Sequence, residues 1–298
     1  MKIFVTGGTG FIGRYILRHF AQLGHTLRAV HRRSSDRSGL DDVASAVEWV
    51  EGELGDGREA ERVAGCDAVV HSALYHPGGG FHGGEGDLPS FLRTNLLGTI
   101  ELIEAARAAG VGRFVFVSTC AVHERIYQDR PLDETHPTTP FSHYGAHKAA
   151  IEQFVHSYGW GHKYPICALR PTGVYGTAHP ASESKYFELV RSIVRGEDVT
   201  CERGGKEVHA ADVAKAAGIL LTAEYVEGEA FNCYDRYISE YDVANIARRL
   251  SGSKSTINGT RTQPKNQIVT EKLRHLGMQF GSDGLLQRSV KELIDAAG

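Results

Sequence analysis

Cysteine is scarce in this chain, and no two cysteines stand close enough to suggest a pair. The 298 residues include five cysteines, an odd number, without any Cys-x-x-Cys spacing. Widely separated single cysteines are typical of free thiols in a reducing compartment. The sequence therefore predicts no disulfide framework.

Long apolar runs and blocks of positive charge are also missing. No apolar stretch approaches the roughly 20 residues that a membrane-spanning helix needs, and the opening residues lack the segments of a secretory leader. The formal net charge is -3, with no basic block that could follow a phosphate backbone. These absences argue against a membrane or nucleic-acid partner, and they predict a soluble cytoplasmic protein that binds a small molecule.

What the sequence does contain, from its first residues, is a strand, a glycine-dense turn and a helix. Residues 2–6 are rich in β-forming side chains, and residues 11–20 follow a helical apolar pattern. Gly8, Gly10 and Gly13 satisfy the G-x-G-x-x-G spacing between them. Such glycines let the backbone turn sharply and let a pyrophosphate approach the helix N-terminus. The predicted dinucleotide-binding residues of this stretch are Gly7, Gly10, Phe11, Ile12 and Gly13.

Strands and helices keep alternating after this turn, which predicts an α/β fold with a doubly wound parallel sheet. Further strands are expected at 26–30, 47–50, 67–73 and 113–119, and helices at 59–64, 88–109 and 142–154. The strand at 26–30 completes a βαβ unit of the expected length, which disfavours the alternative of a glycine turn that binds nothing. Beyond residue 171 the alternation loosens, and a second, smaller lobe is expected.

The residues after the second strand bear on the choice of cofactor. An acidic side chain at this place usually holds the ribose hydroxyls of NAD, whereas an arginine accommodates the extra phosphate of NADP. This chain has Arg32 and Arg33 there, and no acid before Asp36. We therefore expect NADP to be favoured over NAD, with Arg32 the first phosphate ligand and Arg33 the second. A solvated turn is the alternative interpretation of these arginines.

Tyr144 and Lys148 lie four residues apart on a predicted helix and so share one face. An ammonium about 5 Å from the phenol, at an effective dielectric of ~20, would supply on the order of 3 kcal/mol. Bringing the tyrosine pKa to neutrality needs roughly 4 kcal/mol, and Thr119 and a nicotinium ring would provide the difference. Tyr144 is thus predicted to exchange a proton with an alcohol or carbonyl while a hydride moves. A solvated helix face is the alternative for an isolated pair.

Two other features of the sequence are a glycine-rich loop, whose role stays open, and a pair of histidines that does not predict a metal site. The glycine-rich loop at 78–86 follows the carboxyl end of the fourth strand, where ligands bind in open α/β sheets, and it is either a lid or a surface loop. His143 and His147 are four apart, but Tyr144 stands where zinc-peptidase chemistry needs a glutamate, and a third ligand is missing. No metal site is expected.

Five blocks of the sequence, in order, resemble the extended short-chain dehydrogenase/reductases of the NAD-dependent epimerase/dehydratase family. The blocks lie at residues 7–13, 117–123, 144–148, 169–176 and 208–214. The resemblance implies a Rossmann-type NAD(P)-binding domain over 1–171 with 209–235, and a smaller C-terminal substrate-binding lobe over 172–208 with 236–298. The cleft between them is the expected ligand site. Homodimers are also implied by family analogy.

The resemblance also implies roles for individual residues. Thr119 would bind the reacting oxygen, Tyr144 would be the acid/base and Lys148 the ribose ligand. Further cofactor contacts are expected from Glu53, Leu54, Ser72, Ala73, Asn95, Tyr144, Lys148 and Pro171. Substrate contacts are expected from Tyr75, His76, Cys120, His123 and Tyr175.

Three departures from the family pattern bear on the reaction. Dehydratases of this family carry two acids directly after the threonine, where this chain has Cys120 and Ala121, so water elimination is disfavoured. Nucleotide-sugar enzymes usually have an asparagine in place of Gly173 and an arginine near Gly205, and Lys206 or Arg203 could substitute for that arginine. The expected activity is hydride transfer to or from a sugar-like or small carbonyl substrate. Alternatives are a nucleotide-sugar epimerase with retained cofactor and a non-catalytic NAD(P)-binding sensor or scaffold.

Overall fold

The chain folds into two units in the computed structural model, which describes residues 1–78 and 83–298. The first unit comprises Met1–Pro171, Val213–Cys233 and Val269–Met278. The second comprises Thr172–Asp212, Tyr234–Ile268 and Gln279–Gly298. These boundaries differ from the predicted domains mainly at residues 269–278, which belong to the first unit and not to the C-terminal lobe. Part of the glycine-rich loop, residues 79–82, lies outside the described residues, so its two interpretations stay open.

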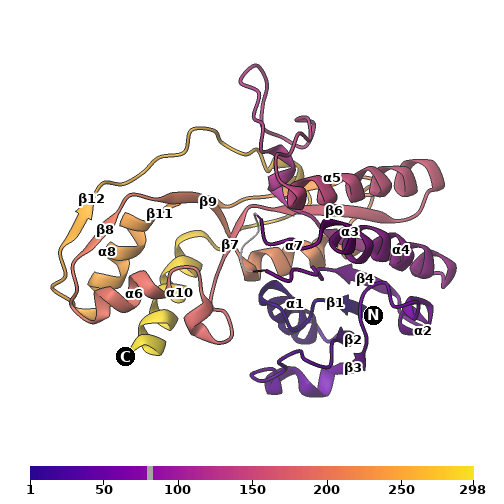
Figure 1. The fold of residues 1–298 in the computed structure, drawn as a ribbon, viewed down its shortest axis with the longest axis horizontal. Coiled ribbons are helices and arrows are strands. Elements are labelled where there is room, and N and C mark those ends of the chain that lie inside the picture. Colours follow the sequence, from indigo (N-terminus) through magenta and orange to yellow (C-terminus); the bar gives the residue numbers. More distant parts are fainter. Residues whose placement is uncertain (79–82) are drawn as a thin grey trace. The chain divides into compact units, whose positions relative to one another are not determined.

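The first unit is built on a seven-stranded parallel sheet with the order β10-β6-β5-β4-β1-β2-β3 (Figure 1). The strands are β1 (Lys2–Thr6), β2 (Thr26–His31), β3 (Val47–Glu51), β4 (Ala68–His71), β5 (Arg113–Val117), β6 (Ile166–Pro171) and β10 (Ala230–Cys233). The direction of winding reverses between β1 and β4, which pair with Thr6 opposite His71. The carboxyl ends of these two strands therefore frame the point where open α/β sheets bind ligands. The predicted fold class is confirmed.

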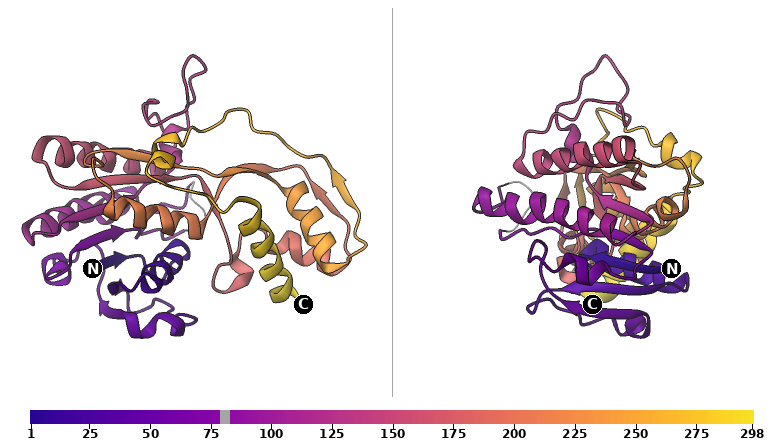
Figure 2. Two further views of the ribbon diagram at one scale, coloured as in Figure 1. Left: turned by 180° about the vertical axis from the view of Figure 1, so that it is seen from behind. Right: turned by 90° about the vertical axis from the view of Figure 1, so that its right-hand side faces the viewer.

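Helices cover both faces of this sheet because the strands bury apolar side chains on both sides. The helical segments are α1 (Phe11–Gln22), η1 (Asp41–Ala46), α2 (Glu59–Val63), α3 (Leu88–Leu92), η2 (Arg93–Leu97), α4 (Gly98–Ala108), η3 (Cys120–His123), α5 (His143–His156), η4 (Ser157–Gly161), α7 (Ala210–Thr222) and α9 (Glu271–His275). Figure 2 shows α4 beside α5, and both contribute to one core cluster with Phe114 and Phe116 of β5. On the other face α7 meets α1, where Gly218 approaches Phe20.

The single helix predicted over 88–109 is interrupted by the π-helical segment η2. Asn95 in this segment donates from its side chain to the carbonyl of Phe91 at 3.0 Å, and the Thr99 hydroxyl donates to the carbonyl of Asn95 at 2.5 Å. Side chains thus satisfy carbonyls that the wider turn leaves without their usual helical donors. The apolar period alone does not reveal such a widening.

The second unit has its own small sheets and core. The order β11-β9-β7 joins β11 (Arg236–Ser239), β9 (Gly204–His209) and β7 (Gly173–Tyr175), and β12 (Ile257–Gly259) pairs with β8 (Val199–Cys201). The helices are η5 (Ala181–Glu183), α6 (Phe187–Val194), α8 (Glu240–Ser251) and α10 (Ser282–Ala297). Apolar side chains of α6, α8 and α10 form its core. In the described residues, no helix has both the length and the apolar character to cross a membrane.

Candidate active site

The glycine turn between β1 and α1 can be built only with small residues. Gly7 has a φ of 73°, and a Cβ placed on it would lie 2.7 Å from the amide nitrogen of Ala73. A Cβ on Gly13 would lie 1.9 Å from the carbonyl oxygen of Gly7. Gly10 caps α1 without a side chain, so the first amide groups of this helix stay open to an anion. The turn fits the pyrophosphate of a dinucleotide.

A cavity of about 270 Å³ lies against this turn within the first unit. Eight of the expected ligand contacts line it, namely Gly7, Gly10, Arg32, Glu53, Leu54, Ser72, Ala73 and Tyr75. The other expected cofactor residues do not line it, namely Phe11, Ile12, Gly13, Arg33, Asn95, Tyr144, Lys148 and Pro171. The sequence analysis missed several lining residues, including Thr9, Ser35, Arg62 and Thr94. The cavity therefore runs from the glycine turn along the carboxyl ends of β1, β2 and β4.

Charged side chains surround the part of this cavity that follows β2. Arg32 is exposed, and its amide nitrogen donates to the hydroxyl of Ser35 at 3.0 Å. Asp36 is held by Arg14, which donates to its carbonyl oxygen at 2.9 Å and lies 3.9 Å from its carboxylate. Arg62 is buried and donates to Asp56, and its guanidinium occupies the space that a Cβ on Gly52 would need. Arg32 and Ser35 thus line the cavity after β2, whereas Asp36 does not.

Thr119, Tyr144 and Lys148 come together at the carboxyl end of β5. Thr119 caps η3, and its hydroxyl accepts from the amide of Ala121 at 3.1 Å and also hydrogen-bonds Tyr144. Lys148 is 4% exposed, donates from Nζ to the carbonyl of Val117 at 2.8 Å and lies 4.6 Å from the centre of the Phe116 ring. The predicted three residues therefore share one site.

The electrostatics of this site contradict the predicted acidification of the phenol. Burial raises the pKa of Tyr144, and the hydrogen bond to Thr119 opposes this only in part. Burial also lowers the pKa of Lys148 to about 7, with Glu152 acting in the opposite direction. The lysine is directed to a carbonyl and an aromatic ring, and it is itself close to losing its charge at neutral pH. Tyr144 is consequently a protonated phenol in this structure.

Asn95 supports the site without facing the cavity. It is 2% exposed, accepts from the amide of Tyr75 at 2.7 Å and donates to the carbonyl of Tyr75 at 2.9 Å. Its side chain therefore fixes the segment that leaves β4. Tyr75 and His76 in that segment are half-buried.

The remaining expected substrate contacts differ in exposure. Cys120 is half-buried, and its thiol donates to the carbonyl of Arg170 at 3.0 Å. His123 is 4% exposed and contacts the guanidinium of Arg170. Tyr175 is 1% exposed and packs edge-on against His209 in the core of the second unit. His123 and Tyr175 are thus buried in this structure, and their expected contacts with a substrate stay predictions.

In the described part of the chain, no cluster of three or more histidine, cysteine or carboxylate side chains could hold a metal ion. The sheet order, the glycine turn and the group at the end of β5 define an NAD(P)-binding protein of the Rossmann type. The model of the NAD dependent epimerase/dehydratase family matches residues 3–233. This chain belongs to that family.

Relatives with known reactions fall into more than one class. A 4-hydroxy-2-methyl-3-oxo-4-farnesyl-3,4-dihydroquinoline-1-oxide ketoreductase of Stigmatella aurantiaca is 32% identical over 75% of this chain and 65% of its own length. A UDP-glucose 4-epimerase of Azospirillum brasilense is 31% identical over 100% of this chain and 95% of its own length. The structure of Thermus thermophilus UDP-glucose 4-epimerase in complex with NAD is similar, with a TM-score of 0.79 at 23% identity, covering 100% of this chain and 99% of the other.

Proposed function

We propose that this protein transfers a hydride between a nicotinamide cofactor and an alcohol or carbonyl carbon of a sugar-like or small carbonyl substrate. The observation that carries the proposal is the hydrogen-bonded pair of Thr119 and Tyr144 beside the buried Lys148. Tyr144 and Lys148 lie on α5 and Thr119 follows β5, and the core of the first unit holds these two elements together. A rigid placement of this kind is what acid–base chemistry on a substrate oxygen needs.

The roles of the three residues follow from their protonation states. A bound nicotinamide would supply or accept the hydride. The hydroxyl of Thr119 would hold the substrate oxygen, and Tyr144 would exchange a proton with it at its phenolic oxygen. Because burial raises the pKa of Tyr144, the phenol keeps its proton at neutral pH and is ready to donate it.

The choice between net reduction and epimerisation depends on what happens to the cofactor. The residues after Thr119 are Cys120 and Ala121, which supply no acid for water elimination, so a dehydratase is disfavoured. A reductase consumes one reduced nicotinamide per turnover, whereas an epimerase regenerates it. We propose the reductase, because the glycines at 173 and 205 leave out side chains that nucleotide-sugar enzymes of the family usually carry. Cofactor absorbance during turnover distinguishes the two reactions.

NADP is the proposed cofactor. Arg32 and Ser35 line the cavity after β2, and Arg14 holds Asp36 through its carbonyl oxygen. An arginine and a hydroxyl can bind the additional phosphate, whereas Asp36, the first acid after β2, is engaged by Arg14 and does not line the cavity.

The proposed function is tested by replacing the phenol. Tyr144→Phe should lower kcat by about 100-fold or more, because a general acid typically contributes this much. The dissociation constant for NADPH should stay within about twofold, since the cavity does not include Tyr144. Tyr225→Phe, at a residue that is 89% exposed, is the matched control and should behave as the unmodified protein. Unchanged turnover in Tyr144→Phe would contradict the proposed role of Tyr144. Cofactor binding without any turnover in the unmodified protein would favour the non-catalytic sensor or scaffold instead.

A further inference from the structure

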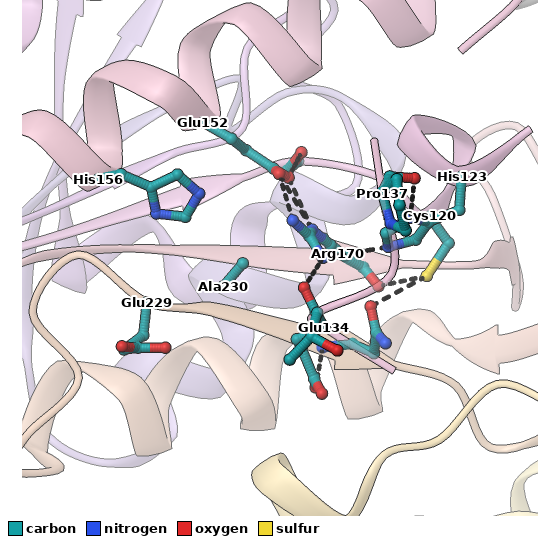
Figure 3. A network of polar contacts seen from close by, with 12 residues as sticks. Cys120, His123, Glu134, Pro137, Glu152, His156, Arg170, Glu229 and Ala230 are labelled. Carbon is teal, nitrogen blue, oxygen red and sulfur yellow. Dashed lines mark hydrogen bonds and ion pairs between the residues drawn. The ribbon is translucent and has the colours of Figure 1, made fainter. Parts of the chain in front are cut away.

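A buried ion pair joins Glu152 of α5 to Arg170 of β6 (Figure 3). Glu152 of α5 is 0% exposed and Arg170 of β6 is 2% exposed. The two side chains meet in a bidentate arrangement, with Nη2 of Arg170 2.6 Å from Oε2 of Glu152 and Nε 3.0 Å from Oε1. The described mechanism uses neither residue.

The carboxylate of Glu152 joins the two elements that carry the catalytic side chains. Glu152 follows Lys148 by one helical turn and Tyr144 by two turns on α5. Its Oε1 atom accepts from the hydroxyl of Ser118 at 2.5 Å. Ser118 immediately precedes Thr119, so this single carboxylate fixes α5 against the end of β5.

The guanidinium of Arg170 extends the same connection to the segments around the site. Its Nη1 atom lies 3.1 Å from Nε2 of His123 and donates to the carbonyl of Glu134 at 3.3 Å. Figure 3 shows these contacts converging on Arg170 from η3 and from the loop that follows it. The carbonyl of Arg170 accepts from the thiol of Cys120 at 3.0 Å. Of the two residues directly beside Thr119 in sequence, Ser118 thus contacts the ion pair itself, whereas Cys120 contacts only the backbone of Arg170.

We propose that Glu152 and Arg170 are positioning residues, which hold Thr119 at the distance from Tyr144 and Lys148 that proton exchange with a substrate oxygen requires. The inference rests on the proposed function. Stability alone does not account for the pair, because apolar side chains of similar volume often replace a buried ion pair without loss of stability. The need to place the catalytic groups accurately does account for the ion pair, since a displacement of about 1 Å at a catalytic group can cost roughly 100-fold in rate.

Glu152 also affects the charge of Lys148. The groups facing this ammonium are Glu152 and His147 on α5, His71 on β4 and the Phe116 ring on β5. The pKa values of His71 and His147 are lowered to about 3, mainly by burial, so both are neutral near pH 7. Glu152 raises the pKa of Lys148 against the effect of burial. Loss of Glu152 should therefore shift the loss of the Lys148 proton to lower pH.

The test removes both charges together, so that no single buried charge is left behind. The double variant Glu152→Leu with Arg170→Met should unfold within a few degrees of the unmodified protein and bind NADPH within about twofold. Its kcat should fall by about 10-fold to 100-fold with KM nearly unchanged, and the alkaline limb of its pH–rate profile should move to lower pH. A folded double variant with the kcat and pH profile of the unmodified protein overturns the proposal.

A smaller change keeps the test decisive if the double variant does not fold. Ser118→Ala removes only the hydrogen bond to Glu152 and should lower kcat several-fold with unchanged NADPH binding, whereas an unchanged kcat overturns the positioning role. Glu227→Gln is the matched control. It breaks an ion pair at the opposite end of β5, where Nη1 of Arg113 lies 3.1 Å from Oε1 of Glu227, and it should leave kcat unaltered. Tyr144→Phe is measured in the same assay. If it retains turnover, the proposed function fails; if it is inactive while the double variant is fully active, only the positioning role fails.

Discussion

Arg32 is the residue on which cofactor preference should depend. It lines the cavity after β2, whereas Arg37 nearby rests over the ring of Trp49 at 5.7 Å and does not line it. We expect the unmodified protein to bind NADPH more tightly than NADH. Arg32→Ala should weaken NADPH binding by about 10-fold or more, because a charge-assisted contact to the phosphate contributes on the order of 1.5–3 kcal/mol. NADH binding should change little.

Fluorescence titration of both reduced cofactors measures this preference. Arg37→Ala is the control and should keep the ratio of the two dissociation constants. Equal affinities in the unmodified protein would contradict the assignment of NADP, and an unchanged ratio in Arg32→Ala would move the phosphate site to Arg33.

At the scale of single residues, the sequence predicts which residues form the site better than it predicts their protonation states. The motif spacing places Thr119, Tyr144 and Lys148 on elements that meet in the structure. The predicted direction of the Tyr144 pKa shift is wrong, because spacing along a helix does not reveal burial or where an ammonium points. The contact of Arg62 with Gly52 is also beyond sequence analysis, since it joins residues whose pairing depends on the fold.

The turn between β1 and α1 is the element whose replacement should affect cofactor binding most directly. A Cβ on Gly13 would lie 1.9 Å from the carbonyl oxygen of Gly7 and 2.8 Å from the Cα of Gly8, both in the backbone. Gly13→Ala therefore has to displace the turn itself. We expect NADPH affinity to fall by about 10-fold or more and the melting temperature to drop by several degrees.

Gly284 provides the matched control for this element. It lies in α10 without a positive φ, and apart from the adjacent backbone of its own helix no described atom lies within 4 Å of the position that a Cβ would take there. Gly284→Ala should stabilise the protein by roughly 0.5–1 kcal/mol, because alanine loses less backbone entropy in a helix. Cofactor titration and thermal unfolding of both variants test the pair of expectations. Unchanged affinity in Gly13→Ala would mean that the dinucleotide does not contact this turn.

The elements of the first unit are easier to predict than those of the second. Strands buried on both faces form nearly continuous apolar runs, and β1, β4 and β5 are found where those runs lie. The short strand β7 has three residues and one buried side chain, so it leaves no pattern in the sequence. The π-helical segment η2 depends on side-chain bonds of Asn95 and Thr99, which an apolar period cannot report.

At the scale of the whole molecule, the division into units needs contacts that the sequence does not display. Residues 269–278 follow a long polar stretch, and their order in the chain suggests the C-terminal lobe. They join the first unit because Leu273 is fully buried there, Lys272 pairs with Glu229, and the amide of Val269 donates to the carbonyl of Leu132 at 3.0 Å.

Buried histidines should make the stability of the whole protein depend on pH. The pKa values of His71 and His147 are lowered to about 3 and that of His123 to about 4, chiefly by burial. In the unfolded chain each titrates near its ordinary value of about 6.5. Between these values the unfolded state binds more protons, so the free energy of unfolding is largest above about pH 6.5 and falls as the pH drops toward 4.

Each of these histidines contributes up to about 1.4 kcal/mol per pH unit within that window. Urea unfolding at several values between pH 7 and pH 5 measures the combined slope. His147→Leu should reduce the slope by the share of one histidine, because it removes a group that only the unfolded state protonates there. His143→Gln, at an exposed position on the same helix, should leave the slope unchanged. A free energy of unfolding that stays constant from pH 7 to pH 5 would show that these side chains are not held neutral by the core.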